Sequence, residues 1–279
     1  MKILNPQTNC LIIGFDSAWT DKPSAPGAIT ALGFGPDHQL SFFEPALVSF
    51  NDALLWIEDR RQHFDLCLIA IDQPTIVPNV SGSRPADRVA ASVISFIGGG
   101  VQPANRSKIG MFNDDAPIWH FMERLTGVSL SIEHSRSATR GLFLIEVFPA
   151  LALSGLNSDF YKRSQAPKYN PANRKKFNLE HWRAVVNTVR DVTIMLKLTH
   201  LTDWVDKQWA LANPKKADQD KLDSVICLLI GLMWRACEPR LTMAIGDGET
   251  GYMVTAASDE TRQRLEAAAT KIDLQFTTK

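Results

Sequence analysis

The sequence is poor in cysteine, and its cysteines lack the spacing of a metal-binding or redox motif. The four cysteines form no CxxC pair, and Cys67 and Cys227 lie within apolar runs, where a buried thiol is stable. Cysteines used in this way are typical of a reducing compartment, so we expect a cytoplasmic protein.

The sequence has no excess of charge of either sign. Its 30 Lys and Arg residues balance 30 Asp and Glu residues, so the formal net charge is zero. Proteins that coat nucleic acid by releasing counterions are strongly basic, which this chain is not. Any contact with nucleic acid or a nucleotide must therefore come from a local basic patch. Nothing in the sequence sets the oligomeric state, and a homo-oligomer is one arrangement that it allows.

Long hydrophobic runs are also missing. The longest, around residues 225–234, is shorter than the roughly 20 residues that cross a bilayer. No N-terminal stretch combines basic residues with a long apolar segment, as a targeting sequence would. We therefore expect a soluble protein with no membrane partner.

The composition is that of an ordinary globular protein. The 279 residues are 45% hydrophobic and 22% charged, which is enough to bury a large core. The chain contains no internal repeat. We predict a single domain over residues 1–279, with inserted loops and helices around 75–140 and 155–215.

Apolar patterning predicts the order of the elements. Three β-like stretches at 11–15, 28–34 and 40–43 predict an antiparallel meander, followed by a helix at 52–61 that Asn51 would cap. The continuous apolar run 66–71 predicts a strand covered on both faces. The later segments predict helices and strands at 85–97 (helix), 118–125 (helix), 142–148 (strand), 179–198 (helix), 216–234 (helix), 241–244 and 252–255 (strand pair) and 259–272 (helix).

This order predicts the fold class. Three strands, a helix, and further strands joined by helical crossovers predict a mixed α/β sheet with helices on both faces. Such an order is found in ribonuclease H-like folds, so we expect a ribonuclease H-like sheet of a three-strand antiparallel meander plus parallel strands.

Acidic residues stand at the ends of two predicted strands and on a helix. Asp16 ends the first strand, Asp72 ends the fourth, and Asp220 and Asp223 lie three residues apart on an apolar helix. If the two strands are parallel neighbours, their carboxyl ends coincide and the two aspartates meet. The helix would then add a third carboxylate, for which Asp223, flanked by apolar residues, is preferred and Asp220 is the secondary candidate.

Three adjacent carboxylates suit a divalent metal. Mg²⁺ and Mn²⁺ bind carboxylates, water and substrate phosphates, and two such ions can stabilise the attacking and leaving oxygens of a displacement at phosphorus. Without metal the carboxylates would repel and one would be protonated. Each aspartate also has a simpler interpretation: Asp16 and Asp72 as turn or cap residues, and Asp220 as a solvated helix residue beside Lys221.

Five short motifs resemble a known family. They are Ile13-Gly14-Phe15-Asp16-Ser17-Ala18-Trp19, Ile69-Ala70-Ile71-Asp72-Gln73-Pro74, Arg84-Pro85-Ala86-Asp87-Arg88, Glu146-Val147-Phe148-Pro149-Ala150 and Asp220-Lys221-Leu222-Asp223-Ser224. In order and spacing, over residues 11–255, they resemble the domain-of-unknown-function family 429, described as predicted nucleases with a ribonuclease H-like fold.

The resemblance implies a metal-dependent nuclease. By position, Asp16 and Asp72 match the first two acids of the fold and Asp223 matches the acid on the helix. Glu146 matches a strand-end motif in which it would be a further metal ligand or a base. Asp72 is followed by Gln73-Pro74-Thr75, where the family often has a small residue and then Pro-Leu. This departure leaves the shape of the pocket, and hence the substrate, open.

Two groups of basic residues are candidates for substrate binding. Arg84 and Arg88 begin a helix after the Asp72 strand, where they would clamp a phosphate; the alternative is an ion pair with Asp87. The basic segment 161–176 would follow a nucleic-acid backbone and stack bases on its two tyrosines, and the alternative is a solvated loop. Its candidate contacts are Lys162, Lys168 and Arg174.

The leading hypothesis is therefore a Mg²⁺- or Mn²⁺-dependent nuclease. A catalytically silent protein that binds nucleotide or nucleic acid in the same pocket is the main alternative. A phosphotransferase of the actin-like or sugar-kinase type is a distant third, because such proteins repeat the sheet in two lobes and no duplication is visible in this sequence.

Overall fold

The computed structural model describes residues 9–35 and 39–277. Within these ranges the largest element is a six-stranded sheet in the order β3-β2-β1-β4-β6-β5. Its strands are β1 (Cys10–Asp16), β2 (Gly27–Phe34), β3 (Leu40–Val48), β4 (Leu66–Ile71), β5 (Val128–Ser129) and β6 (Gly141–Glu146). β1, β2 and β3 form an antiparallel meander, whereas β4, β6 and β5 run parallel to β1. The predicted mixed α/β fold is confirmed, and the arrangement is consistent with a ribonuclease H-like sheet.

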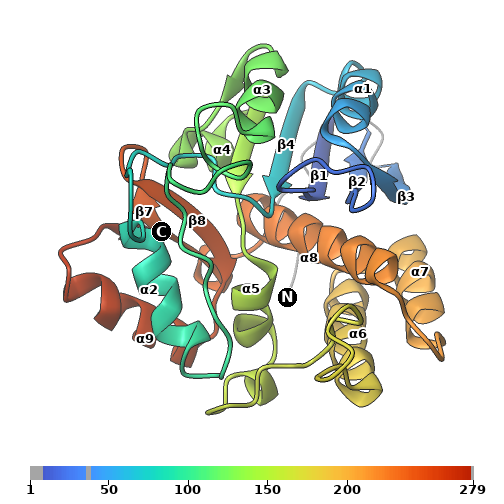
Figure 1. The fold of residues 1–279 in the computed structure, drawn as a ribbon. Helices are drawn as coiled ribbons and strands as arrows, with labels where there is room; N and C mark the ends of the chain where they lie inside the picture. The colour runs from blue at the N-terminus through green and yellow to red at the C-terminus, as the bar shows by residue number, and fades with distance from the viewer. Residues whose placement is uncertain (1–8, 36–38, 278–279) are drawn as a thin grey trace.

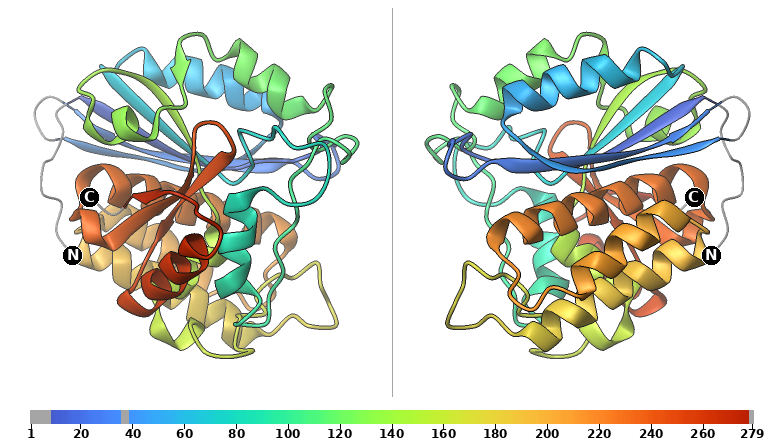
Figure 2. Two further views of the ribbon diagram at one scale, coloured as in Figure 1. Left: turned by 90° about the vertical axis from the view of Figure 1, so that its left-hand side faces the viewer. Right: turned by 90° about the vertical axis from the view of Figure 1, so that its right-hand side faces the viewer.

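Helices cover both faces of this sheet (Figures 1 and 2). α8 (Lys216–Ala236) lies against β1, β2 and β4 on one face, with α6 (Leu179–Met195) and α7 (Thr199–Trp209) packed beyond it. α1 (Phe50–Arg61) and α3 (Pro117–Arg124) cover the other face. Residues of β1 alternate between the two cores, since Ile12 packs towards α8 and Ile13 packs away from it.

The carboxyl-terminal part of the chain forms a second, smaller sheet. It has the order β8-β7-β9, formed by β7 (Thr242–Asp247), β8 (Gly251–Ala256) and β9 (Phe276–Thr277). With α2 (Pro85–Ile94), α5 (Pro149–Leu156) and α9 (Asp259–Thr270) it encloses a third core. The remaining elements are α4 (Ile132–Ser137) and the short 3₁₀ helices η1 (Ser158–Phe160) and η2 (Pro239–Leu241).

Several predicted boundaries differ from the structure for identifiable reasons. α1 is capped by Ser49, whose hydroxyl accepts a bond from the Asp52 amide, so the predicted cap at Asn51 is wrong. β3 continues past Pro45 because it is an edge strand, where proline is tolerated. β6 ends at Glu146, two residues before the predicted end, and Pro149 is the first residue of α5. The sequence patterns do not predict α5, α4, α7, β5 or β9.

The described residues contain neither a membrane-spanning helix nor a disulfide bond. No helix there combines the length and the apolar character that crossing a membrane requires. All four cysteines are free thiols and all are buried, which confirms the burial predicted for Cys67 and Cys227.

Candidate active site

Asp16 and Asp72 lie side by side at the carboxyl ends of two neighbouring parallel strands. In the register of β1 and β4, Phe15 is paired with Ile71, so the next residue of each strand is an aspartate. The Asp72 amide then donates a 2.8 Å hydrogen bond to the Phe15 carbonyl oxygen. The predicted meeting of these two strand ends is therefore present in the structure.

Strand alternation points both aspartates towards α8. Ile12 of β1 and Ala70 of β4, each an even number of residues before an aspartate, pack in the core that contains α8. Gly14 lets the helix come close, because a Cβ there would collide with the backbone of Ser224 and Leu228. The close contact of α8 with β1 is what brings its own polar residues to the two strand ends.

α8 contributes two buried acids and a lysine. Asp220 and Asp223 are 8% and 6% exposed. Lys216, one turn before Asp220 on the helix, forms an ion pair with it. Asp223 accepts hydrogen bonds of 2.8 Å from the Tyr169 hydroxyl and from the Gln219 amide, one at each oxygen. The expectation that Asp220 is solvated is therefore wrong: it lies in the same acidic group as Asp223.

The acidic cluster, defined as Asp16, Asp72, Asp220 and Asp223, is electrostatically strained. Burial, followed by the charges of Asp223 and Asp72, raises the pKa of Asp16 well above its usual value. The pKa of Asp72 is raised by burial, then by Asp223 and Glu146. Burial raises the pKa of Asp223 to about 6, against the lowering effects of Lys216, Tyr169 and Gln219. The protein thus holds together carboxylates that disfavour each other's ionised form.

The cluster is not a preformed cage for a cation. Among the described residues no group of three or more His, Cys, Asp and Glu side chains is placed to hold one metal ion. The carboxylates of Asp16 and Asp72 nevertheless accept no hydrogen bond from that part of the chain, unlike that of Asp223. Beside Asp223, the buried Oε1 of Gln219 also has no hydrogen-bond partner. The carboxylates of Asp16 and Asp72 and the Gln219 amide oxygen are therefore free to bind a ligand.

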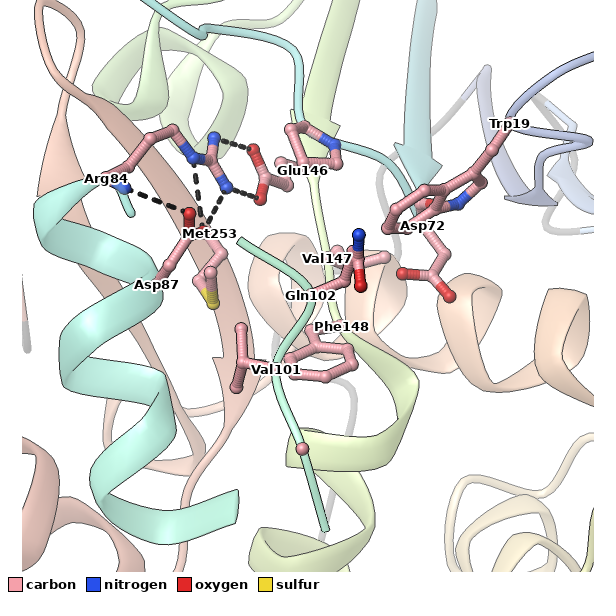
Figure 3. Close-up of a pocket in the computed structure, with 12 residues that line it drawn as sticks. Trp19, Asp72, Arg84, Asp87, Val101, Gln102, Glu146, Val147, Phe148 and Met253 are labelled. Atoms are coloured by element: carbon pink, nitrogen blue, oxygen red, sulfur yellow. Dashed lines mark hydrogen bonds and ion pairs between the residues drawn. The ribbon is translucent and has the colours of Figure 1, made fainter. Parts of the chain in front are cut away.

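Two cavities adjoin the cluster and share Trp19 as a wall. The larger, about 450 Å³, is lined by Asp16, Asp220 and Lys216. The smaller, about 140 Å³, has Asp72 at its edge and is shown in Figure 3. Trp19 is fixed between them, because its indole N–H donates a 2.9 Å bond to the Asp72 carbonyl oxygen. A ligand at the two aspartates would have space on either side of the Trp19 ring.

Glu146 and Arg84 bind each other instead of facing the cluster. The Arg84 guanidinium forms a two-bond ion pair with Glu146, at 2.6 and 2.8 Å, and also pairs with Asp87. Figure 3 shows this network on the side of the pocket opposite Asp72. Alternation along β6 places Glu146 on the side of Leu144, which packs in the core away from α8. Arg84 is wholly buried, so the ion-pair alternative describes it and a phosphate clamp does not.

Glu146 has hydrogen-bond partners at both of its carboxylate oxygens. Its Oε2 also accepts the Thr75 amide at 3.3 Å, so both oxygens are occupied. Burial raises the pKa of Glu146, and Arg84 opposes that shift. A carboxylate held in this way orders the loop after β4, and its role as a metal ligand or a base stays a prediction.

The other predicted substrate contacts are on the surface. Arg88 is exposed on α2 and Arg174 is exposed in the segment before α6. Lys162 is paired with Asp159, and the Lys168 ammonium donates a 3.4 Å bond to the Gly98 carbonyl oxygen. Whether any of them contacts a substrate stays a prediction.

Four residues contact the acidic cluster in ways that the sequence does not predict. Tyr169 was expected to stack bases, but it is buried and bonded to Asp223, and no sequence signal links residues that far apart. Gln219 and Lys216 each lie four residues before an acid of α8, a spacing that could have identified them. Trp19 gave no signal beyond its place in the Asp16 motif.

Fold and site together define a mixed α/β protein with a buried acidic cluster at the carboxyl ends of parallel strands. Residues 52–244 match the model of a family described as "Protein of unknown function (DUF429)", and the chain belongs to this family, as its motifs predicted. The match contains Asp72, Glu146 and Asp223, and it begins after Asp16. No curated protein and no solved structure matches the chain significantly.

Proposed function

We propose that this protein is a divalent-metal-dependent nuclease that hydrolyses phosphodiester bonds at the acidic cluster. The observation that carries the proposal is the meeting of Asp16 and Asp72 with Asp223, three carboxylates that are far apart in sequence. Asp223 raises the pKa of both other aspartates, and Asp72 raises that of Asp16. Proteins place such destabilised groups together mainly where the groups have a function.

The side chains fit Mg²⁺ or Mn²⁺ better as part of a substrate complex than as a closed metal site. Mg²⁺ is usually held by one or two carboxylates, with water and substrate phosphates completing its shell. Asp16 and Asp72, whose carboxylates accept no hydrogen bond from the described residues, would be those two ligands. Asp223 is the third ligand in this proposal, and it would exchange one of its two present hydrogen bonds to serve. A bound divalent ion would supply positive charge for the oxygens of a displacement at phosphorus.

The chain's own residues would position the substrate. Lys216 lies at the wall of the larger cavity, and the charges of Asp16, Asp220 and Asp223 keep the pKa of its ammonium raised even though burial lowers it. It therefore stays protonated and would pair with a phosphate oxygen. Trp19, fixed by its bond to the Asp72 carbonyl, would limit the positions open to the nucleotide next to the reacting phosphate.

A catalytically silent nucleotide-binding protein is the second candidate. The observation in its favour is that both Asp223 oxygens are occupied, which leaves fewer free carboxylates than two metal ions need. This candidate predicts that metal and nucleotide bind while no phosphodiester bond is cut.

The decisive experiment measures cleavage and metal binding on the same proteins. Single- and double-stranded DNA and RNA are incubated with the wild type, Asp16→Asn and Asp72→Asn in Mg²⁺, Mn²⁺ or EDTA. Asp191→Asn is the matched control, since Asp191 is exposed on α6. We expect metal-dependent cleavage that falls at least 100-fold in the two cluster variants and is unchanged in the control.

Metal binding gives a readout that does not depend on turnover. A ligand that binds the folded state raises the melting temperature, so Mn²⁺ should stabilise the wild type and Asp191→Asn but not Asp16→Asn. Stabilisation without cleavage would favour the silent alternative. Cleavage at the wild-type rate in both cluster variants would rule out the nuclease proposal.

The proposed function also implies a compartment and a partner. We propose a cytoplasmic protein, in keeping with four free and buried thiols. Nucleic acid or a nucleotide is the proposed partner, bound through the basic segment 161–176, and the oligomeric state stays open to a homo-oligomer.

A further inference from the structure

The smaller cavity beside Asp72 has the walls of a binding site for a flat ring. Its sides include Trp19, Phe148, Val101 and Met253, and Gln102 lies at its exposed rim (Figure 3). Aromatic and aliphatic surface therefore surrounds most of the space, while one amide at the entrance offers a donor and an acceptor. This is the usual composition of a site for a small organic group.

The volume limits the size of that group. The cavity measures about 140 Å³. An apolar cavity of roughly 150 Å³ takes up one benzene molecule. A single six-membered ring therefore fits, whereas a fused two-ring system would extend out of the cavity and into solvent.

The charged wall of the cavity argues against an anionic ligand. Arg84 makes five hydrogen bonds, to Asp87, Glu146 and the Ile76 carbonyl oxygen, which use all five of its N–H groups. Two carboxylates face this one guanidinium, so the wall offers no positive charge to a phosphate or carboxylate. An anionic group is therefore disfavoured inside the cavity, and an uncharged ring is compatible with its walls.

Three of the walls, Trp19, Met253 and Phe148, are held in place before any ligand binds. The Trp19 indole is fixed by its bond to the Asp72 carbonyl oxygen, and its ring packs on Phe112 with centroids 5.4 Å apart. Met253 is buried in β8, and Phe148 precedes α5, so neither belongs to a free loop. Val101 and Gln102 form the remaining side and belong to the irregular segment that follows α2. The fixed walls select ligands by shape, because they are already in place when a ring enters.

We propose that this cavity binds one pyrimidine base of the substrate, unstacked from its neighbours, while the adjoining phosphate lies at Asp16 and Asp72. The proposal rests on the proposed function and names its substrate class: single-stranded nucleic acid, or a nucleotide, with a pyrimidine next to the reacting phosphate. Asp72 supports it because this residue belongs both to the cavity and to the acidic cluster. Aromatic side chains and an amide are the groups with which proteins recognise an extruded base.

Calorimetry on the whole chain in Mg²⁺ tests the base directly. The probes are CMP, UMP, AMP and ribose 5-phosphate, which share a phosphate and differ in the base. We expect CMP and UMP to bind at least tenfold more tightly than AMP and ribose 5-phosphate. Equal affinity for all four probes, or tighter binding of AMP, would overturn the proposal.

Two variants test whether the preference for a pyrimidine base arises in this cavity. Val101→Phe fills it and should weaken CMP binding at least tenfold, whereas Val80→Phe is the matched control because Val80 is 74% exposed elsewhere. Gln102→Ala changes only an exposed side chain, so it leaves folding intact and should weaken CMP binding several-fold. Melting curves check that each variant is folded, and unchanged CMP affinity in folded Val101→Phe and in Gln102→Ala would overturn the proposal.

Base preference and cleavage are measured separately, so the base site and the nuclease proposal can fail independently of each other. A pyrimidine preference that Val101→Phe removes, in a protein that cuts no nucleic acid, keeps the base site and rejects hydrolysis. Asp16-dependent cleavage that is indifferent to the base and to Val101→Phe keeps hydrolysis and rejects the base site.

Discussion

The backbone amide of Asp72 donates a 2.8 Å hydrogen bond to the carbonyl oxygen of Phe15, the residue before Asp16. This bond continues the parallel ladder of β1 and β4 by one step, so both aspartates leave the sheet at the same edge and on the same side. Their separation is therefore set by the backbone of the sheet and does not depend on flexible side chains.

The metal-free protein should lose stability as the pH rises from about 4 to about 6. Burial raises the pKa of Asp223 to about 6, whereas an unfolded aspartate ionises near 3.9. Above pH 4 the unfolded state releases this proton first, so the folded state is disfavoured by up to about 2 kcal/mol on reaching pH 6. Urea unfolding in EDTA measures this, as the difference between the wild type and Asp223→Asn at each pH. A difference that does not change between pH 4 and 6 would contradict the raised pKa.

Replacing the buried Arg84 should destabilise the fold much more than replacing the exposed Arg88. Arg84→Met leaves the buried Glu146 and Asp87 carboxylates without their counter-ion, which should lower the free energy of unfolding by about 3–5 kcal/mol. The control Arg88→Met lies on the exposed face of the same helix and should change it by less than about 0.5 kcal/mol. Chemical denaturation compares the two, and equal effects would show that the buried network is not required for stability.

Adding one methyl group at Gly14 should force α8 away from the sheet. The new Cβ of Gly14→Ala would overlap the backbone of Ser224 and Leu228, which cannot rotate aside, so we expect a loss of about 3 kcal/mol. Gly248→Ala is the control, since nothing lies within 4 Å of a Cβ there. Thermal unfolding gives the comparison. A Gly14→Ala protein as stable as the control would show that α8 does not depend on this close contact.

The basic segment should contribute to nucleic-acid binding in a salt-dependent way. Each phosphate contact of a single strand adds about 0.7 to the slope of log affinity against log salt concentration. Lys168→Ala and Arg174→Ala should each weaken oligonucleotide binding and reduce this slope by up to that amount. Lys162→Ala should have a smaller effect, because Lys162 is already paired with Asp159. Fluorescence anisotropy at several salt concentrations measures both quantities, and unchanged slopes would support the solvated-loop alternative.

Local chemistry explains which elements could be predicted from the sequence. The continuous apolar run of β4 and the mixed pattern of α8 are visible in any short window, and the assigned bounds agree with the structure to within a few residues. The α5 helix is not predicted because a proline after an apolar strand indicates a chain break, whereas Pro149 is the first residue of a helix. The short β5 and β9 strands depend on neighbours distant in the chain, so their own residues carry little signal.

The candidate site likewise combines features that are visible in the local sequence with features that depend on the folded chain. The sequence by itself determined that Asp16 and Asp72 end their strands, because the change from apolar to acidic residues is local. Only the tertiary structure decided which groups surround them: Asp220 joins the cluster with Lys216 paired to it, Tyr169 bonds to Asp223, and Glu146 pairs with Arg84. The physical reason is that a side chain's neighbours depend on strand register, on which face of the sheet it occupies and on how closely a helix packs. These are properties of the folded chain as a whole.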